Sequence, residues 1–187
     1  MTRTHIKLIL LPVFLAAISN LFIACTNAVP AEPDIQIGAD TPTIDFIKDG
    51  ISEYVIVRAD NAGVDETNAA VELRNSVREK TDVEITLTTD LERRGTDPAD
   101  RYEYEILVGA TNREESRTVL AGIGRYDFAV RVINEKIVIV GGMESKTHEA
   151  VKYFIENVLM EGGLSLKADY DYTDVSPNDP EYTGKMI

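Results

Sequence analysis

The sequence predicts an α+β domain: a short mixed β-sheet with two long amphipathic helices packed on one face. Three observations predict it. Strand-like and helix-like segments alternate along the chain, the two longest helical segments each have one apolar face, and several strand segments alternate apolar and polar residues. With 187 residues, 44% apolar and 27% charged, the chain has an ordinary globular composition and is too short for a (β/α)₈ barrel, which needs about 250 residues.

The first three elements are a strand, a helix and a second strand. The run EYVIVRA at residues 53–59 is rich in residues that favour a strand. A helix is expected at residues 65–80, because Asp65 and Glu66 place acid at its start and apolar residues recur on one face. That face consists of Ala69, Leu73 and Val77, with Ala70 beside them. Residues 83–88, VEITLT, alternate as a half-buried strand does.

A polar loop at residues 89–101 leads to the second half of the domain. Residues 103–109 predict a strand, and residues 112–121 predict a short helix. The clearest hairpin pairs residues 126–133 with residues 136–140. Its turn residues are Asn134 and Glu135. The return strand is apolar throughout, so we expect it to be buried on both faces.

The strongest helical pattern covers residues 144–160. Its apolar residues are Ala150, Val151, Phe154, Ile155, Val158 and Leu159. We expect this face to pack against the hairpin residues Val130, Val132, Ile137 and Ile139. Two glycines end the helix, and residues 164–167 then predict a short strand. The acidic, tyrosine-rich segment at residues 169–187 is expected to be an extended arm that is at most partly ordered.

The N-terminus has the pattern of an export signal. Arg3, His5 and Lys7 precede an apolar run that is too short and too interrupted for a confident membrane-spanning helix of about 20 residues. The run ends in LFIAC, in which Cys25 follows a small residue, Ala24. This ending resembles the lipobox of bacterial lipoproteins, although Phe22 stands where leucine is usual. The resemblance implies that Cys25 is lipidated and becomes the first residue of the mature protein; a plain signal peptide with a chance cysteine, or an uncleaved anchor, is the alternative.

The predicted organisation therefore has four parts. These are a signal peptide at 1–24, the lipidated Cys25 with a flexible tether at 25–45, the α+β domain at 46–168, and the acidic arm at 169–187. The expected location is the cell envelope, with the protein held to the membrane by its lipid and facing away from the cytoplasm.

Composition excludes several kinds of chemistry. Beyond residues 1–24, which hold Arg3 and Lys7 and no acid, the chain keeps 17 basic and 32 acidic residues, a formal charge of −15. Such a surface does not suit nucleic acid, which is bound through lysine and arginine. The single cysteine cannot form an intrachain disulfide, and with one histidine in the mature part, His148, we expect no metal site and no cofactor.

Three stretches of the domain together resemble a known module. They are residues 54–80, the strand ending ILVGATN at 106–112, and the hairpin and helix from Tyr126 to Glu156. They are similar to the small N-terminal domain that precedes the catalytic barrel in family 20 β-N-acetylhexosaminidases and family 67 α-glucuronidases. The resemblance covers about residues 50–168 and implies an accessory fold with a carbohydrate-related role. Because those enzymes hold their catalytic residues in the barrel, no catalytic residue is implied here.

Several residue groups could form a site, but each fits a structural role better. The acids Asp169, Asp171 and Asp174 could offer oxygens to Ca²⁺ but lack the glycine and glutamate of an EF-hand loop, so a solvated tail is favoured. Gly122 with Gly124, and Gly141 with Gly142, lack the spacing of a phosphate loop and fit turns and caps. His148 is favoured as a structural residue.

Carboxyl pairs and tyrosines are further candidates for a site. Glu103 with Glu105, and Glu114 with Glu115, could imitate a glycosidase pair, but 32 acids make chance pairs inevitable. Five tyrosines could stack on sugars, although strand and edge positions are the commoner role: Tyr102, Tyr104, Tyr126, Tyr170 and Tyr172.

We therefore expect a non-catalytic, surface-anchored lipoprotein whose domain binds a glycan or a glycan-processing partner. The alternative is a structural or protein-interaction module with no sugar role, left by truncation of a larger glycoside hydrolase. We expect no hydrolase activity, because the acids should keep ordinary pKa values and two helices on one sheet offer little depth for a pocket of several hundred Å³.

Overall fold

The computed structural model describes residues 41–92, 101–159 and 165–177, all within one compact unit that spans Gly38–Ile187. The strands are β1 (Thr43–Asp45), β2 (Val55–Arg58), β3 (Leu87–Thr89), β4 (Glu105–Val108), β5 (Phe128–Ile133), β6 (Lys136–Gly141), β7 (Ser165–Lys167) and β8 (Asp171–Asp174). The helices are α1 (Val64–Thr81), α2 (Glu114–Leu120) and α3 (Glu144–Phe154), and α3 continues into a π-helical segment, η2 (Ile155–Leu159).

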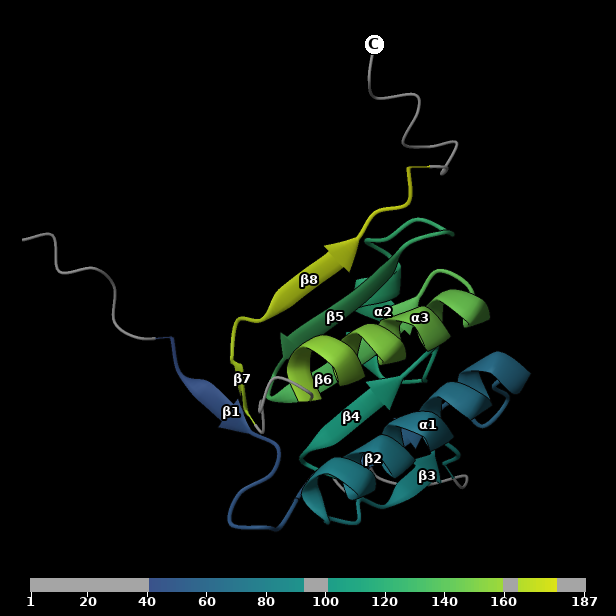
Figure 1. Cartoon of the computed structure of the whole chain (residues 1–187). Coiled ribbons are helices and arrows are strands. Elements are labelled where there is room, and N and C mark those ends of the chain that lie inside the picture. Colours follow the sequence, from purple (N-terminus) through teal and green to yellow (C-terminus); the bar gives the residue numbers. More distant parts are fainter. Residues whose placement is uncertain (1–40, 93–100, 160–164, 178–187) are drawn as a thin grey trace, which may run out of the picture. The chain divides into compact units, whose positions relative to one another are not determined.

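Six strands form one mixed sheet in the order β3-β2-β4-β6-β5-β8 (Figure 1). β3, β2, β4 and β6 are parallel, whereas β5 runs antiparallel to both of its neighbours, β6 and β8. In the centre of the sheet, Ile106 lies opposite Ile56 on one side and Ile137 on the other. β1 and β7 form a separate antiparallel pair in which Ile44 faces Leu166.

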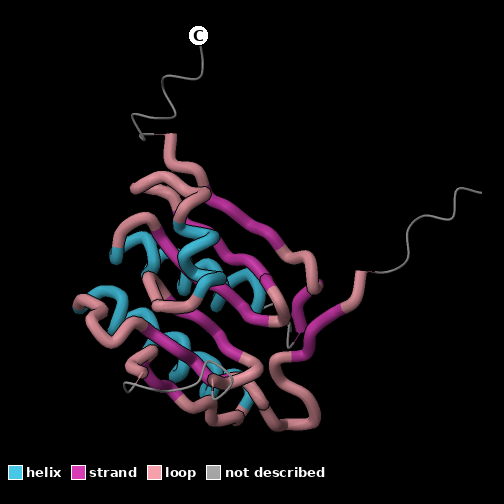
Figure 2. Tube along the Cα trace, turned by 180° about the vertical axis from the view of Figure 1, so that it is seen from behind, coloured by secondary structure: helices cyan, strands magenta, loops and turns pink. Residues whose placement is uncertain are grey.

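The predicted fold class is confirmed: α1 and α3 lie side by side on one face of the sheet (Figure 1). Residues that alternate along each central strand point to opposite faces. Ile137 and Ile139 of β6 join the core beneath α1 and α3, whereas Val138 and Val140 join a smaller core beneath α2, on the face seen from behind in Figure 2. The return strand of the hairpin is therefore buried on both faces, as its composition predicted.

The last helix packs as its pattern predicted. Phe154 is fully buried and its ring centroid lies 5.9 Å from that of Phe46. The other predicted contact residues belong to the same buried core: Val151, Ile155, Leu159, Val130, Val132, Ile137 and Ile139. Burying a phenylalanine side chain stabilises a fold by about 1.5–3 kcal/mol relative to leaving it exposed, so this helix contributes much to the core.

The hairpin turn is also where the sequence placed it. Asn134 and Glu135 both have positive φ, 50° and 63°, which is the type I′ geometry that matches the twist of paired strands. Glutamate rarely adopts this conformation. Here the Glu135 carbonyl accepts a 2.7 Å hydrogen bond from the Tyr54 hydroxyl, which ties the turn to the residue before β2.

Some segments differ from expectation. β3 is shorter than the predicted strand at 83–88, although Val83 and Ile85 are buried. Part of the expected C-terminal arm forms β8 and pairs with β5. The edge of β5 needs a partner for its backbone groups, and the Tyr172 ring gives β8 an apolar contact by stacking on Tyr153.

Candidate functional site

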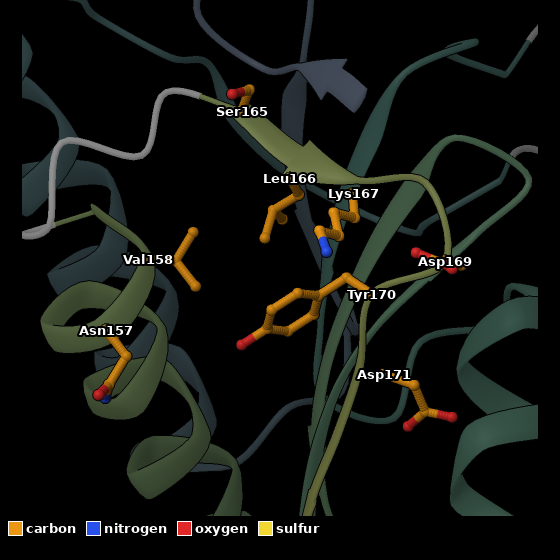
Figure 3. A pocket seen from close by; sticks show the side chains of 8 residues that line it. All are labelled: Asn157, Val158, Ser165, Leu166, Lys167, Asp169, Tyr170 and Asp171. Atoms are coloured by element: carbon orange, nitrogen blue, oxygen red, sulfur yellow. The ribbon is translucent and has the colours of Figure 1, made fainter. Parts of the chain in front are cut away.

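One candidate site is a pocket of about 560 Å³ beside β7, which we call the β7 pocket (Figure 3). Three segments line it: η2, strand β7, and the turn that leads into β8. The lining residues are Asn157, Val158, Ser165, Leu166, Lys167, Asp169, Tyr170 and Asp171. Its volume lies within the range of about 300–1,000 Å³ that is usual for ligand sites. The expectation that this fold would lack a pocket of this volume was wrong, because β7 and the η2 segment that follows α3 add walls that the six-stranded sheet alone does not supply.

The β7 pocket combines an apolar base with exposed polar groups. Leu166 and Val158 are buried, whereas Asn157, Ser165 and Lys167 are exposed. The Asn157 amide donates to the Tyr153 carbonyl at 2.9 Å, which leaves its own carbonyl oxygen as an acceptor. The arrangement can therefore contact an apolar surface and hydrogen-bond polar groups at its edge.

The Tyr170 side chain points into the β7 pocket, toward Val158 and Asn157 of η2 (Figure 3). Its hydroxyl is 3.1 Å from that of Tyr153. Burial raises the pKa of Tyr170 above its ordinary value, and the Tyr153 hydroxyl adds to the shift, so the ring stays neutral. A neutral, half-buried tyrosine offers an apolar face and a polar tip to a ligand.

The five tyrosines that could stack on sugars do not line one common pocket in the described structure. Tyr170 alone among them lines a described pocket, while Tyr172 stacks on Tyr153 with centroids 3.9 Å apart and planes 7° apart. Tyr104 packs on Tyr54 with centroids 5.4 Å apart. The remaining two are exposed: Tyr102 and Tyr126.

A second hollow, of about 350 Å³, lies beyond the carboxyl ends of β2, β4 and β6. β2 leads through α1 to β3 on one side, while β4 leads past α2, on the other face, toward β5 and β6 on the other side. The strand order therefore reverses between β2 and β4, which is the topological switch point where open α/β sheets usually bind ligands. We call this hollow the switch-point cleft.

Two glutamates face the switch-point cleft. Glu66, in the first turn of α1, is only 4% exposed, and its carboxylate accepts a 3.1 Å hydrogen bond from the Ala110 N–H. Glu144, in the first turn of α3, lies at the exposed rim. Both need nearby glycines: a Cβ at Gly109 would come within 1.9 Å of the Glu66 carboxyl, and one at Gly63 within 1.9 Å of the Glu144 carboxylate. Gly109 also has a φ of 80°, which only glycine adopts readily.

The environment of Glu66 overturns part of the sequence-based expectation. Burial above all, together with the nearby Glu144 and Asp90 carboxylates, raises the pKa of Glu66 to about 7 against the lowering effect of the Ala110 N–H. Acidic residues in a first helical turn are usually solvated, so the sequence carried no signal of this burial. A carboxyl group that titrates near neutral pH can hold or release a proton at a ligand.

The other buried glutamate, Glu105, is part of an ion-pair network rather than a catalytic pair. Arg113 donates to it at 2.9 and 3.0 Å, and Lys136 does so at 2.9 Å. Lys136 also lies 3.6 Å from Glu115. One member of each candidate glycosidase pair, Glu105 and Glu115, thus takes part in charge pairing beside α2.

The candidate site residues His148, Asp169 and Asp171 have partners within the protein. The Nε2 atom of His148 lies 2.5 Å from Glu72, which links α3 to α1. Asp171 pairs with Arg131 at 2.7 Å, and Asp169 accepts from the Thr41 hydroxyl at 3.3 Å. No cluster of three metal-ligating side chains occurs among the residues that the structure describes.

The glycines considered for a phosphate loop lie in turns, at the end of β6 and just before α3. Gly124 donates its N–H to the buried Asp127 carboxylate at 2.9 Å. Gly141 and Gly142 precede α3 and line the switch-point cleft, where the Gly141 N–H donates to the Thr147 hydroxyl at 3.0 Å.

Cys25 lies outside the described residues, so its lipidation stays a prediction. Within residues 41–92, 101–159 and 165–177, no helix is both long and apolar enough to cross a membrane.

No protein-family model matches this sequence, and no curated protein matches it. Among solved structures, a GH138 enzyme targeting pectin rhamnogalacturonan II is similar over 65% of this chain, with 10% sequence identity and a TM-score of 0.40. The matched part is 15% of that enzyme's chain. The resemblance to the accessory domains of family 20 and family 67 enzymes stays a prediction.

Proposed function

We propose that this protein is a non-catalytic, lipid-anchored protein of the cell envelope whose domain binds a saccharide in the β7 pocket. The observation that supports this function is the composition of the pocket, in which exposed polar side chains surround buried Leu166 and Val158 and the Tyr170 ring. A sugar ring has an apolar face of C–H groups and an edge of hydroxyls. An apolar base with amide, hydroxyl and ammonium groups at the rim is complementary to both.

A binding measurement tests this proposal. We expect a glycan array, followed by calorimetric titration, to identify a saccharide ligand whose affinity falls at least fivefold in Asn157→Ala, because the variant removes an exposed acceptor from the pocket. Asn68→Ala is the matched control, since Asn68 is exposed on α1 and lies outside the β7 pocket. If the protein binds no saccharide on the array, the domain is a structural or protein-interaction module instead. Equal losses in both variants would remove the β7 pocket as the binding place.

The lipid at Cys25 supplies the membrane attachment in this proposal. One acyl chain binds membranes only marginally, whereas two or more anchor a protein stably, so diacylation can hold an acidic domain with no basic patch. We expect Cys25→Ala to release the protein into the medium or to leave it unprocessed, as fractionation and the mass of the mature N-terminus report. A Cys25→Ala protein that is processed and retained like the wild type would contradict the anchor.

One observation favours a second candidate function, a catalytic one at the switch-point cleft. Glu66 combines burial with a pKa of about 7 and lies near a second carboxylate, Glu144, which is the environment that general acids often have. Our proposal expects no turnover of chromogenic N-acetylglucosaminides or glucuronides by the purified protein. Reproducible turnover that disappears in Glu66→Gln would replace it with the catalytic function.

A further inference from the structure

We infer that the saccharide taken by the β7 pocket carries an anionic group, and that Lys167 binds this group. The inference rests on the proposed function, because it names the class of ligand for the same pocket. It comes from the state of the three charged side chains that line the pocket: Lys167, Asp169 and Asp171.

The two acidic side chains of the β7 pocket have partners within the protein. Asp171 forms an ion pair with Arg131 at 2.7 Å, and Asp169 accepts a hydrogen bond from the Thr41 hydroxyl at 3.3 Å. In the view of Figure 3, both lie on the side of Tyr170 away from Val158. The Asp171 charge is thus paired with Arg131, whereas Asp169 keeps its charge at the exposed rim because its partner is a neutral hydroxyl.

Lys167 is in the opposite situation. Among the described residues, none forms an ion pair or a hydrogen bond with its ammonium group. Figure 3 shows its side chain extending from β7 toward the Tyr170 ring, with the nitrogen facing the pocket. An ammonium ion carries three donors and no acceptor, so a carboxylate or sulfate is the group that satisfies it best.

The negative charge of the whole chain must be compared with the local positive charge of Lys167. Acidic residues outnumber basic ones in the sequence, with a formal charge of −13 for all 187 residues. Screening over about 8 Å at physiological ionic strength weakens that distant charge, whereas a contact pair inside a pocket is screened less. The local ammonium therefore decides which ligands are preferred, by about fivefold for a partly exposed pair.

The test uses the purified full-length protein in detergent and two matched pairs of hexasaccharides. One pair is an oligouronate and its methyl ester, and the other is a sulfated galactan fragment and its desulfated form. At 150 mM salt we expect the anionic member of at least one pair to bind about fivefold more tightly than its neutral counterpart. The pair that shows the preference identifies carboxylate or sulfate as the group.

Variants then assign the preference to the lysine. Lys167→Gln should bind anionic and neutral members equally, with the neutral affinity unchanged, whereas Lys167→Arg should keep the preference. Lys152→Gln is the control, because Lys152 is an exposed lysine of α3 that does not line the pocket. A preference that survives in Lys167→Gln, or tighter binding of both neutral members by the wild type, would overturn the inference while leaving saccharide binding intact. If no hexasaccharide of either charge binds, the proposed function fails as well.

Discussion

The two hollows of this domain use the same helix in different ways. Glu144 and Thr147, in the first turn of α3, line the switch-point cleft, whereas Asn157 and Val158, in its π-helical continuation, line the β7 pocket. In the cleft, the Glu66 carboxylate and the Thr147 hydroxyl accept hydrogen bonds from backbone N–H groups. Neither the Ser165 hydroxyl nor the Lys167 ammonium of the pocket has a hydrogen bond to another described side chain.

The usual ligand position of this kind of sheet is not the position where we propose that the ligand binds. The carboxyl edge of parallel strands is the usual ligand site of an open α/β sheet, because loops diverge there and leave space. Here two carboxylates of the chain line that space, Glu144 close to Gly63 and Glu66 close to Gly109. The β7 pocket differs in that it is lined by an ammonium group, that of Lys167, on a strand that the six-stranded sheet does not include.

The largest effect is expected from a substitution in the core beneath α3, the helix that contributes to both hollows. Phe154 is fully buried between them along α3 and packs on Phe46. Phe154→Ala should lower the free energy of unfolding by about 3–5 kcal/mol, because it leaves a cavity in the core. Urea titration of the variant measures this loss. An unchanged midpoint would contradict the packing of α3 on the sheet, and with it the walls of both hollows.

A smaller effect on stability is expected from Glu66, which lines the switch-point cleft alone. The ordinary pKa of a glutamate is 4.5, whereas that of Glu66 in the fold is about 7. Between these values the folded state keeps a proton that the unfolded chain has released, so wild-type stability should fall as pH rises from about 4.5 to 7. Glu66→Gln removes the buried charge and keeps an acceptor for the Ala110 N–H.

The variant should therefore be more stable than the wild type at pH 8, by up to about 3 kcal/mol, and no different near pH 4.5. Denaturant titrations at both pH values measure the difference, and Glu79→Gln is the control because Glu79 is exposed near the end of α1 and is not among the groups that shift the pKa of Glu66. A Glu66→Gln protein that is less stable at pH 8 would show that the cleft depends on the charged form of Glu66.

Sequence patterns were a good guide to elements and a poor guide to the two hollows. The period of the last helix and the apolar return strand correctly predicted which residues of α3 meet β5 and β6, since both depend on local spacing. The burial of Glu66 depends on Gly109, which is 43 positions away in the chain, and the β7 pocket depends on η2, β7 and the start of β8. These are tertiary arrangements of short, polar segments, and such segments carry no periodic signal.

The location of the bound saccharide is the most direct test of the central claim. Backbone amide shifts of the isotope-labelled protein, recorded during titration with the tightest-binding hexasaccharide, report which hollow is occupied. The account predicts shifts at Asn157 and across residues 165–171, with no change at Asn61, Ala110 and Gly141. Shifts confined to Asn61, Ala110 and Gly141 would place the ligand in the switch-point cleft and contradict the account.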